Sequence, residues 1–369
     1  MATNAKQKPE RVLIYRLGSL GDTLVALPAL HLVARAFPDA ERRMLTSIPP
    51  NAKAPAASAI LDGTGLIHGY LQYPYATRNP FLLLRLWWNL LRWRPGLLVY
   101  MNGSRAVALA KRDERFFRLC GVRNLVGVPI TEDMVCTRSL GASPAEPDAG
   151  EMFEHESSRL ARNLSEIGDA RLADPASWDL HLTEKEQKRA SQVLEPLGRR
   201  GFLSVSFGTK NQSNDWEQHN WKALLERLAD LYPNLALVIC GAAVEAEMSE
   251  FAASGWRARS VNPVLNLCGQ LSPRESAAVM GRSVLYLGHD SGPTHLAAAV
   301  QTTCVAIYGG RNLPGIWFPY GDQHKVFYHR VSCSGCRLQT CTVEKKRCVL
   351  SITVDEVLGE VTKRLPPSL

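Results

Sequence analysis

The chain has 369 residues, of which 46% are hydrophobic and 21% charged, as in a globular protein large enough for two domains. Its formal net charge of +8 predicts anionic partners such as phospholipid surfaces, phosphorylated sugars or nucleic acid. The polar first ten residues lack a signal-peptide core and no stretch reaches the ~18 apolar residues of a membrane span, so we expect a cytoplasmic protein with reduced cysteines.

The first predicted element is a buried strand at Arg11–Tyr15, which runs through a glycine-containing turn into a helix from about Leu24 to Phe37. Asp22 therefore lies beyond the carboxyl end of a strand, where open α/β sheets bind their ligands. The turn has no G-x-G-x-x-G dinucleotide fingerprint. The Asp22 carboxylate suits two roles, that of a helix cap and that of a base acting on a substrate hydroxyl.

The segment from Arg78 to Arg94 is rich in leucine, tryptophan and arginine. A helical projection separates a polar side from apolar residues, the two sets being Arg78, Arg85, Asn89 and Arg92 against Leu84, Trp87, Trp88 and Leu91. Such a helix is typical of an interfacial membrane anchor, and equally of a core-packing helix with an exposed basic side.

The rest of the first half predicts further strands and helices before a connection between domains. We expect a strand at Leu97–Met101, a helix at Ala106–Leu119, a loop at Ala142–Gly150 and a helix at Glu151–Ile167. The segment 168–182, which contains glycine, proline and aspartate, is the predicted inter-domain connection.

The second half alternates strands and helices in the same way. A capping-box spacing at Thr183 opens a helix to about Leu197. Strands are expected at Phe202–Ser206 and Leu235–Ile239, with a helix at 219–231 between them. This alternation favours parallel sheets in both halves.

A turn of small residues at Asp290–His295 lies between the apolar runs Ser283–Leu287 and Cys304–Tyr308. The order predicts strand, turn, helix and strand, with Asp290 or Ser291 as the helix cap. A helix N-terminus that carries a hydroxyl is suited to binding phosphate, although an ordinary capped helix has the same composition.

Four cysteines of the tail, Cys333, Cys336, Cys341 and Cys348, follow the spacing C-x2-C-x4-C-x6-C. Four thiols so close in sequence are able to hold a structural zinc ion, and the alternatives are reduced thiols or a disulfide formed after purification. The other five cysteines lie mostly in apolar runs and are expected in the core.

Taken in order, several segments of the chain resemble glycosyltransferase family 9, which includes the heptosyltransferases of lipopolysaccharide core assembly. The segments that carry the resemblance are 16–30, 207–210, Asp215-Trp216, Asn220-Trp221, Cys240-Gly241, 290–295, Trp317, 319–321 and 352–357. The resemblance implies an α/β protein of the GT-B type, with two Rossmann-like domains facing each other across a cleft. Residues 1–172 would bind the acceptor, residues 173–350 the donor, and residues 351–369 would form a helix that crosses back to the first domain.

The resemblance also implies roles for individual residues. Asp22 would be the catalytic base, and Gly18, Ser19 and Gly21 would shape the loop around the acceptor or the transferred sugar. The residues placed around the donor are Thr209, Lys210, Ser291, Gly292, Thr294 and His295 at the diphosphate, and Glu245 and Asp290 at the nucleoside. The alternatives are a solvated loop lysine for Lys210, a capped or core histidine for His295 and a surface glutamate for Glu245. Some family members carry a lysine shortly before the tryptophan where this chain has Asn214-Asp215, so phosphate binding would fall to Lys210 or another base.

The expected function is therefore inverting, metal-independent transfer of a heptose or related sugar from a nucleotide-diphospho-sugar to a saccharide or lipid-linked saccharide. No cofactor is expected in catalysis, nucleic acid is not an expected partner, and the protein would work in the cytoplasm, peripherally on the inner face of the membrane. Two alternatives remain. One is a sugar-nucleotide epimerase, which has a similar two-domain architecture. The other is a non-catalytic basic adaptor that binds membranes through residues 78–94 and zinc through the tail. The fold and the motifs do not specify the donor sugar, the nucleotide base or the acceptor.

Overall fold

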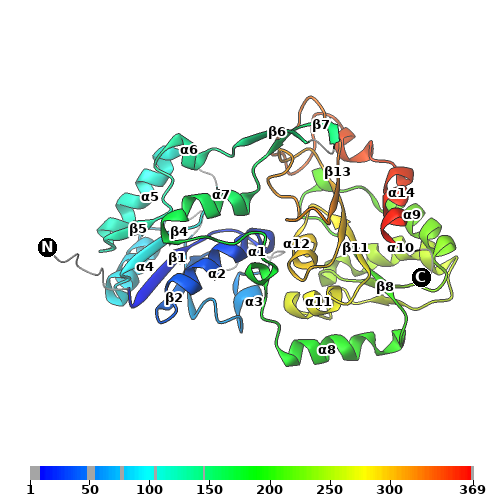
Figure 1. Cartoon of the computed structure of the whole chain (residues 1–369), viewed down its shortest axis with the longest axis horizontal. Helices are drawn as coiled ribbons and strands as arrows, with labels where there is room; N and C mark the ends of the chain where they lie inside the picture. The colour runs from blue at the N-terminus through cyan, green and yellow to red at the C-terminus, as the bar shows by residue number, and fades with distance from the viewer. Residues whose placement is uncertain (1–8, 48–54, 75–78, 104–105, 144–145, 367–369) are drawn as a thin grey trace. The chain divides into compact units, whose positions relative to one another are not determined.

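The computed structural model describes residues 9–47, 55–74, 79–103, 106–143 and 146–366. The chain divides into two compact units, each of them α/β (Figure 1). Unit 1 contains residues 1–138 and 156–178, and unit 2 contains residues 139–155 and 179–369. The division between 178 and 179 falls inside the segment 168–182, whereas the assignment of 139–155 to unit 2 is not foreseen in the sequence.

Unit 1 is built on a five-stranded parallel sheet with the strand order β3-β2-β1-β4-β5. The strands are β1 (Arg11–Tyr15), β2 (Glu41–Thr46), β3 (Gly69–Gln72), β4 (Leu97–Tyr100) and β5 (Asn124–Val126). The helices are α1 (Leu20–Leu24), α2 (Leu27–Ala36), α3 (Ser58–Leu61), α4 (Pro80–Trp93), α5 (Val107–Leu119), α6 (Glu132–Val135) and α7 (Glu156–Asn163). Buried residues of α4 and α5 share one hydrophobic cluster with β1 and β4, so these two helices cover one face of the sheet.

The helix predicted at 24–37 is two helices, α1 and α2, and α1 already begins at Leu20. Pro28 in the first turn of α2 has no N–H to donate to the preceding turn, and this ends the continuous helix. Asp22 therefore lies inside the first turn of α1 and not in a loop.

The loop predicted at 142–150 is wrong, because β6 (Ser139–Ser143) and β7 (Glu146–Phe153) form an antiparallel hairpin across it. The Phe153 N–H donates to the Pro314 carbonyl oxygen at 3.0 Å, and the Arg330 guanidinium donates to the Glu151 carbonyl oxygen. These contacts belong to unit 2 and hold the segment in a strand, so the following helix, α7, begins only at Glu156.

Unit 2 contains a six-stranded parallel sheet with the order β10-β9-β8-β11-β12-β13. The strands are β8 (Phe202–Ser206), β9 (Ala236–Ile239), β10 (Val264–Asn266), β11 (Leu285–His289), β12 (Cys304–Tyr308) and β13 (Lys325–Tyr328). The helices are α8 (Glu184–Leu194), α9 (Gln218–Leu231), α10 (Ala246–Arg257), α11 (Pro273–Met280), α12 (Gly292–Ala299), α13 (Arg347–Leu350) and α14 (Val354–Arg364). The capping box at the start of α8 is present as predicted, with Thr183 and Glu186 as its partners.

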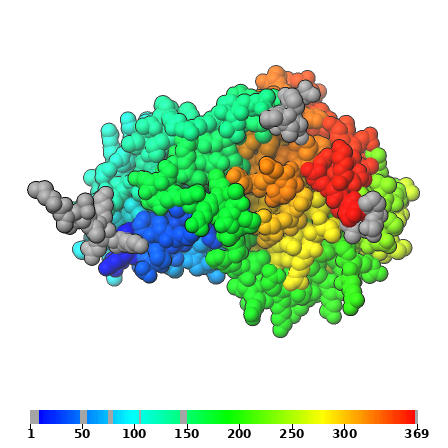
Figure 2. Space-filling view, in the orientation of Figure 1, coloured from blue at the N-terminus to red at the C-terminus, as the bar shows by residue number. Residues whose placement is uncertain are grey.

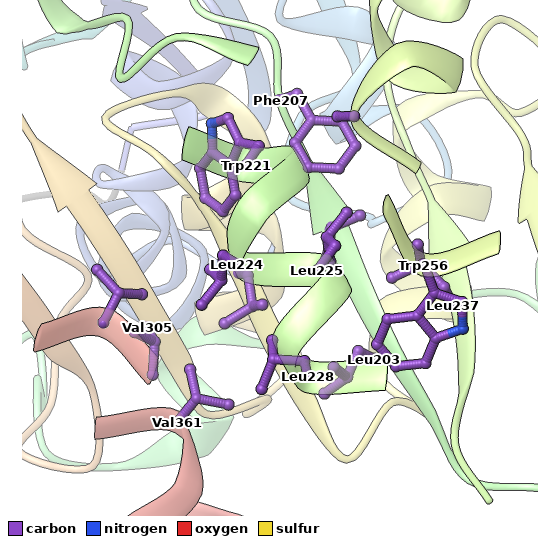
Figure 3. Packing of buried hydrophobic residues seen from close by; sticks show 14 of the residues in the cluster. Leu203, Phe207, Trp221, Leu224, Leu225, Leu228, Leu237, Trp256, Val305 and Val361 are labelled. Carbon is purple, nitrogen blue, oxygen red and sulfur yellow. The ribbon is translucent and has the colours of Figure 1, made fainter. Parts of the chain in front are cut away.

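The core of unit 2 lies between one face of this sheet and the helices α9, α10 and α14 (Figure 3). The Trp221 ring meets the edges of Phe207 and Trp216, with ring centroids 5.3 and 5.0 Å apart. Val361 of α14 is buried in the same cluster, and in the space-filling view α14, in red, lies beside the yellow-green segment that contains α9 (Figure 2). The last helix packs on unit 2, because its apolar stripe completes the core around α9, and its return to the first domain stays a prediction.

In both sheets the strand order reverses at one place. In unit 1 the chain proceeds from β1 to β2 and β3 on one side, and to β4 and β5 on the other. In unit 2 the same reversal occurs between β8 and β11. The carboxyl ends of the two strands at such a switch point diverge into loops with room between them, which is where open α/β sheets bind ligands.

Candidate functional site

Three loops of unit 2 meet at the switch point between β8 and β11. The loop after β8 carries Thr209 and Lys210 and continues to Asn214, β11 leads into Asp290, and β12 leads into the segment 309–312. Strand neighbours in this sheet are parallel, so all three loops leave the sheet at the same edge. The predicted diphosphate residues of both segments are thereby placed in one region of one unit.

The Asp290 carboxylate ties these loops together. Its Oδ2 accepts hydrogen bonds from the Asn214 side-chain amide at 2.9 Å and from the Asn312 amide at 3.4 Å. Burial raises the pKa of Asp290 to about 6, against the lowering effect of the Arg311 charge and of the two amides. Gly309 is required beside this cluster, because a Cβ there would come within 2.7 Å of the Asn214 side-chain oxygen.

Two cations lie in these loops. Lys210 is exposed, as the solvated alternative foresees. Arg311 follows the pair Gly309-Gly310, and its Nη1 donates to the Asn312 side-chain oxygen at 3.3 Å. The Arg311 Nε is buried and has no hydrogen-bond partner within the described part of the chain. The sequence analysis did not single out Arg311, although a double glycine after a buried strand, followed by a basic residue, is a signal for such a site.

At the start of α12 the two hydroxyl groups, of Ser291 and Thr294, are used differently from each other. Ser291 is the N-cap residue, yet its hydroxyl makes no capping hydrogen bond and is buried without a partner in the described residues. The Thr294 hydroxyl is fully buried and donates to the His289 carbonyl oxygen at 2.5 Å, so this side chain supports the turn and is not presented to a diphosphate. Pro293 further reduces the number of backbone N–H groups at this end of the helix. Gly292 is the first residue of α12.

His295 is buried and neutral. Burial, together with the smaller effect of the nearby His155 and His324 rings, lowers the pKa of His295 to about 3. A neutral imidazole still has one N–H to donate, but it supplies no positive charge to a phosphate at physiological pH. The predicted phosphate role is therefore limited to a single hydrogen bond, and the core alternative describes the position of the side chain.

A second buried histidine, which the sequence analysis missed, lies at the end of β11. His289 Nε2 accepts two hydrogen bonds of 3.1 Å, one from the Trp216 backbone N–H and one from the Trp221 indole N–H. Burial lowers the pKa of His289 to about 4, in keeping with an unprotonated Nε2. This ring fixes the β8 loop to the end of β11, and its partners lie about 70 residues away in the sequence, where no local pattern reveals them.

Glu245 lies at the carboxyl ends of β8 and β9. Its Oε2 accepts the Ala242 N–H at 2.9 Å, and its carboxylate occupies the space where side chains at Gly208 and Gly241 would otherwise be. Burial raises the pKa of Glu245, and the hydrogen bond from Ala242 opposes this. Two glycines that follow neighbouring strands, β8 and β9, thus leave room for this carboxylate at the carboxyl edge of the sheet.

In unit 1 the Asp22 carboxylate caps α1. Its Oδ2 accepts the Ser19 backbone N–H at 2.7 Å and the Ser19 hydroxyl at 3.1 Å. Gly18 has a φ of 136°, and a Cβ at this position would overlap the Asp22 side chain. Asp22 is partly exposed, and its Oδ1 accepts no hydrogen bond from the residues that the structure describes. Because Oδ2 alone accepts the capping hydrogen bonds, Oδ1 of Asp22 remains available to a ligand. The predicted loop residue Gly21 lies within α1.

A buried ion-pair network fixes the backbone of this loop. Arg16 Nε and Nη2 donate to the Asp22 carbonyl oxygen at 3.0 and 2.7 Å, and its Nη1 donates to the Met101 carbonyl oxygen after β4 at 2.5 Å. Arg16 also pairs with Glu156 at 3.1 Å, and Glu156 pairs with Arg159 at 2.8 Å. Burial by itself raises the pKa of Glu156, but the two guanidinium groups lower it below its ordinary value. The network joins the ends of β1 and β4 at the switch point of unit 1.

The predicted zinc site is not formed. Within the described residues, no group of three or more His, Cys, Asp or Glu side chains is placed to hold a metal ion, and all four tail cysteines belong to these residues. Hydrogen bonds from the backbone N–H groups of Lys346, Glu344 and Val343 lower the pKa of Cys341, which is more exposed than the buried Cys348.

A family model described as glycosyltransferase family 9 (heptosyltransferase) matches residues 159–347, about half of the chain. The chain belongs to glycosyltransferase family 9. It is therefore a glycosyltransferase, and the two Rossmann-like units conform to the GT-B fold of that family.

Named relatives and solved structures agree with this family. The chain is 25% identical over 361 residues to lipopolysaccharide heptosyltransferase 1 of Pseudomonas aeruginosa, covering 90% of this chain and 88% of that protein. A family 9 glycosyltransferase from Veillonella parvula aligns over 96% of this chain and 97% of its own at a TM-score of 0.69 and 14% identity. An ADP-heptose lipopolysaccharide heptosyltransferase II from Escherichia coli aligns over 96% and 98% at a TM-score of 0.63 and 14% identity. An E. coli heptosyltransferase with ADP-2-deoxy-2-fluoro heptose aligns over 96% and 100% at 0.59 and 16%.

The helices among the described residues are too short or too polar for any of them to traverse a lipid bilayer.

Replacing Asp290 by Asn tests the buried carboxyl at the switch point of unit 2. Because the folded pKa of about 6 exceeds the unfolded value near 3.9, the stabilisation from the protonated carboxyl is complete at low pH and is lost as the pH rises through 6. We expect the free energy of unfolding of the Asn variant, relative to wild type, to rise between pH 4 and pH 7 by about 2 kcal/mol. Urea unfolding at several pH values measures this difference. The exposed Asp322→Asn exchange is the control, and a pH-independent difference for Asp290→Asn would contradict the assignment.

Replacing Glu156 by Gln tests the ion-pair network of unit 1. The change keeps the size of the side chain but leaves two buried guanidinium groups without their anion, so we expect a loss of about 3–5 kcal/mol in the free energy of unfolding. The matched Glu114→Gln exchange removes a more exposed pair with Arg118 and should cost less than about 1 kcal/mol. Equal effects in urea unfolding would show that the network does not hold the loop.

Proposed function

We propose that this chain is an inverting, metal-independent glycosyltransferase of surface-glycan assembly. It transfers a heptose or a related sugar from a nucleotide-diphospho-sugar to a saccharide or lipid-linked saccharide, as in lipopolysaccharide synthesis. Family membership supports the reaction class, and the similarity to lipopolysaccharide heptosyltransferase 1 and to two E. coli heptosyltransferases that use or bind ADP-linked heptose supports ADP-heptose as the donor. The observation that carries the proposal is the set of anion-binding groups at the switch point of unit 2: Lys210, Arg311 and the unpartnered Ser291 hydroxyl.

The donor diphosphate would lie over the loops of β8, β11 and β12. Breaking the bond between the sugar and the diphosphate leaves negative charge on the departing oxygens, and preorganised cations and hydroxyl donors lower the free energy of that state. Lys210 and Arg311 supply the charge and Ser291 supplies a donor that is not used elsewhere. These two cations offset part of the charge that develops on the diphosphate, which is why we propose transfer without a metal.

The nucleoside would lie beside Glu245. A carboxylate at the end of a strand is suited to accept hydrogen bonds from ribose hydroxyls, and Gly208 and Gly241 leave the room that the Glu245 carboxylate occupies there. Asp290 already accepts two amide hydrogen bonds, so we assign it to the organisation of the loops and not to the nucleoside.

Asp22 would act as the base on the acceptor. Its Oδ1 takes the proton of the acceptor hydroxyl while the hydroxyl oxygen attacks the anomeric carbon from the side opposite to the diphosphate. The new carbon–oxygen bond forms as the bond to the diphosphate breaks, which inverts the configuration of the anomeric carbon. The cap from Ser19 and the close packing of Gly18 hold the carboxylate in one orientation during this step.

Asp22→Asn removes the base and keeps the cap, because the Asn side-chain oxygen is still able to accept the Ser19 N–H. We expect turnover with ADP-heptose and a suitable acceptor to fall by about 10²- to 10⁴-fold, with an unchanged dissociation constant for ADP. Steady-state kinetics and calorimetry measure the two quantities, and the exposed Asp39→Asn exchange is the control. Turnover at the wild-type level would remove Asp22 from the mechanism.

Incubation of the donor alone should give no epimerised sugar, which separates the transferase from an epimerase.

Lys210→Gln and Arg311→Gln test the diphosphate site. Each variant loses one charge-assisted hydrogen bond to phosphate, so we expect the dissociation constant for ADP to rise by about 10- to 100-fold. Adenosine, which has no phosphate, should bind the variants and the wild type equally in calorimetry. Lys185→Gln on the exposed side of α8 is the matched control. ADP affinity that is unaltered in both variants would place the diphosphate elsewhere.

A further inference from the structure

The helix α4 exposes most of its apolar surface. Its buried residues form a single narrow stripe, Leu86, Leu90 and Trp93, that packs on the sheet of unit 1 (Figure 1). The exposed hydrophobic residues of the helix, with their exposed fractions, are Phe81 (75%), Leu82 (41%), Leu83 (40%), Leu84 (56%), Trp87 (37%) and Trp88 (62%). Core packing therefore accounts for one stripe only, and two tryptophans that a core-packing helix would bury lie on the outside.

This concentration is specific to one part of the chain. Among the described residues, six of the sixteen exposed large hydrophobic side chains belong to α4, and Phe251 is the one exposed aromatic in that set that lies elsewhere. Leu119, 74% exposed at the end of α5, adjoins the same surface, because the Trp87 indole N–H donates to its carbonyl oxygen at 3.0 Å. We call α4 and Leu119 the α4 face. A contiguous exposed apolar surface of this kind marks a site of interaction.

The charge of the α4 face selects the partner. Arg85, Arg92 and Arg94 are exposed, and residues 79–96 contain no aspartate or glutamate. A second copy of the chain docked by the same face about a two-fold axis would bring these arginines against the same arginines, without an acid to compensate. A bilayer with anionic headgroups offers phosphates to the arginines and an apolar interior to the aromatic rings.

We propose that the α4 face binds the surface of an anionic phospholipid bilayer, with α4 lying in the interfacial plane. Phe81, Leu84, Trp87 and Trp88 enter the boundary between headgroups and acyl chains, and the arginines contact lipid phosphates. This binding does not depend on which sugar is transferred. If the acceptor is a glycolipid, as proposed above, the α4 face also brings the enzyme to the plane in which its acceptor diffuses.

Co-sedimentation of the full chain with vesicles tests this surface. We expect binding to vesicles of phosphatidylethanolamine and phosphatidylglycerol at physiological salt, and binding at least about tenfold weaker to vesicles of phosphatidylcholine. Phe81→Ser combined with Trp88→Ser should weaken binding to the anionic vesicles by about tenfold or more, and Arg85→Gln combined with Arg92→Gln should remove the preference for anionic lipid. Leu231→Ser, at an exposed leucine of unit 2, is the control.

Two further measurements keep the result decisive. Melting temperatures of the variants near that of the wild type show that the substitutions leave the fold intact, and turnover with a water-soluble acceptor should be unchanged in all of them, which separates this surface from the reaction itself. Failure of the wild type to sediment with anionic vesicles would overturn the proposal. So would a wild-type dimer, seen by sedimentation velocity, that the Phe81→Ser, Trp88→Ser variant dissociates, because the α4 face would then join two copies of the chain.

Discussion

A parallel sheet obliges all the loops that follow its strands to leave at one edge, and the reversal of strand order leaves space between two of them. Both units of this chain obey that constraint, and each places its candidate residues there: Asp22 beside β1 and β4, and Lys210, Asp290 and Arg311 beside β8, β11 and β12. The chemistry assigned to each unit depends on this geometry. Residues 80 to 100 positions apart in the sequence become neighbours because their strands are neighbours.

The two switch points are stiffened by different means. In unit 1 a buried ion-pair network through Arg16 and Glu156 holds the loop backbone, and it tolerates burial because each charge has partners. In unit 2 the corresponding task falls to hydrogen bonds: His289, which is neutral, accepts from the Trp216 backbone N–H and the Trp221 indole N–H, and the Asp290 carboxylate accepts from two amides. In unit 1 the Asp22 carboxylate keeps one oxygen free, which suits the task of removing a proton.

The alternation of apolar runs and small-residue turns predicts the parallel sheets well, since buried strands such as Phe202–Ser206 carry their signal locally. The same local signal fails for β7, which is a strand because residues 314 and 330 bind its backbone. It fails for His289 and Glu156 for the same reason, because the fold brings their partners near. Arg311, in contrast, follows the pair Gly309-Gly310, which is a local signal. Asp22 is an intermediate case, because the sequence allows a cap or a base and the carboxylate has one oxygen for each. The sequence also leaves open how the Thr294 hydroxyl is used, because a hydroxyl at a helix start is equally able to hydrogen-bond within the turn, as it does with the His289 carbonyl oxygen.

The hairpin of β6 and β7 has a consequence for how the molecule is made. It emerges from the ribosome between two segments of unit 1, yet its backbone partner at Pro314 is translated about 160 residues later. At the usual pace of translation, on the order of ten to thirty seconds pass before that partner exists. During this interval all the strands of unit 1 are available, and unit 1 is able to fold while the hairpin still lacks its partner in unit 2. A protein truncated after residue 178 would keep the hairpin without that partner. Unit 1 is therefore best expressed alone with residues 139–155 removed as well.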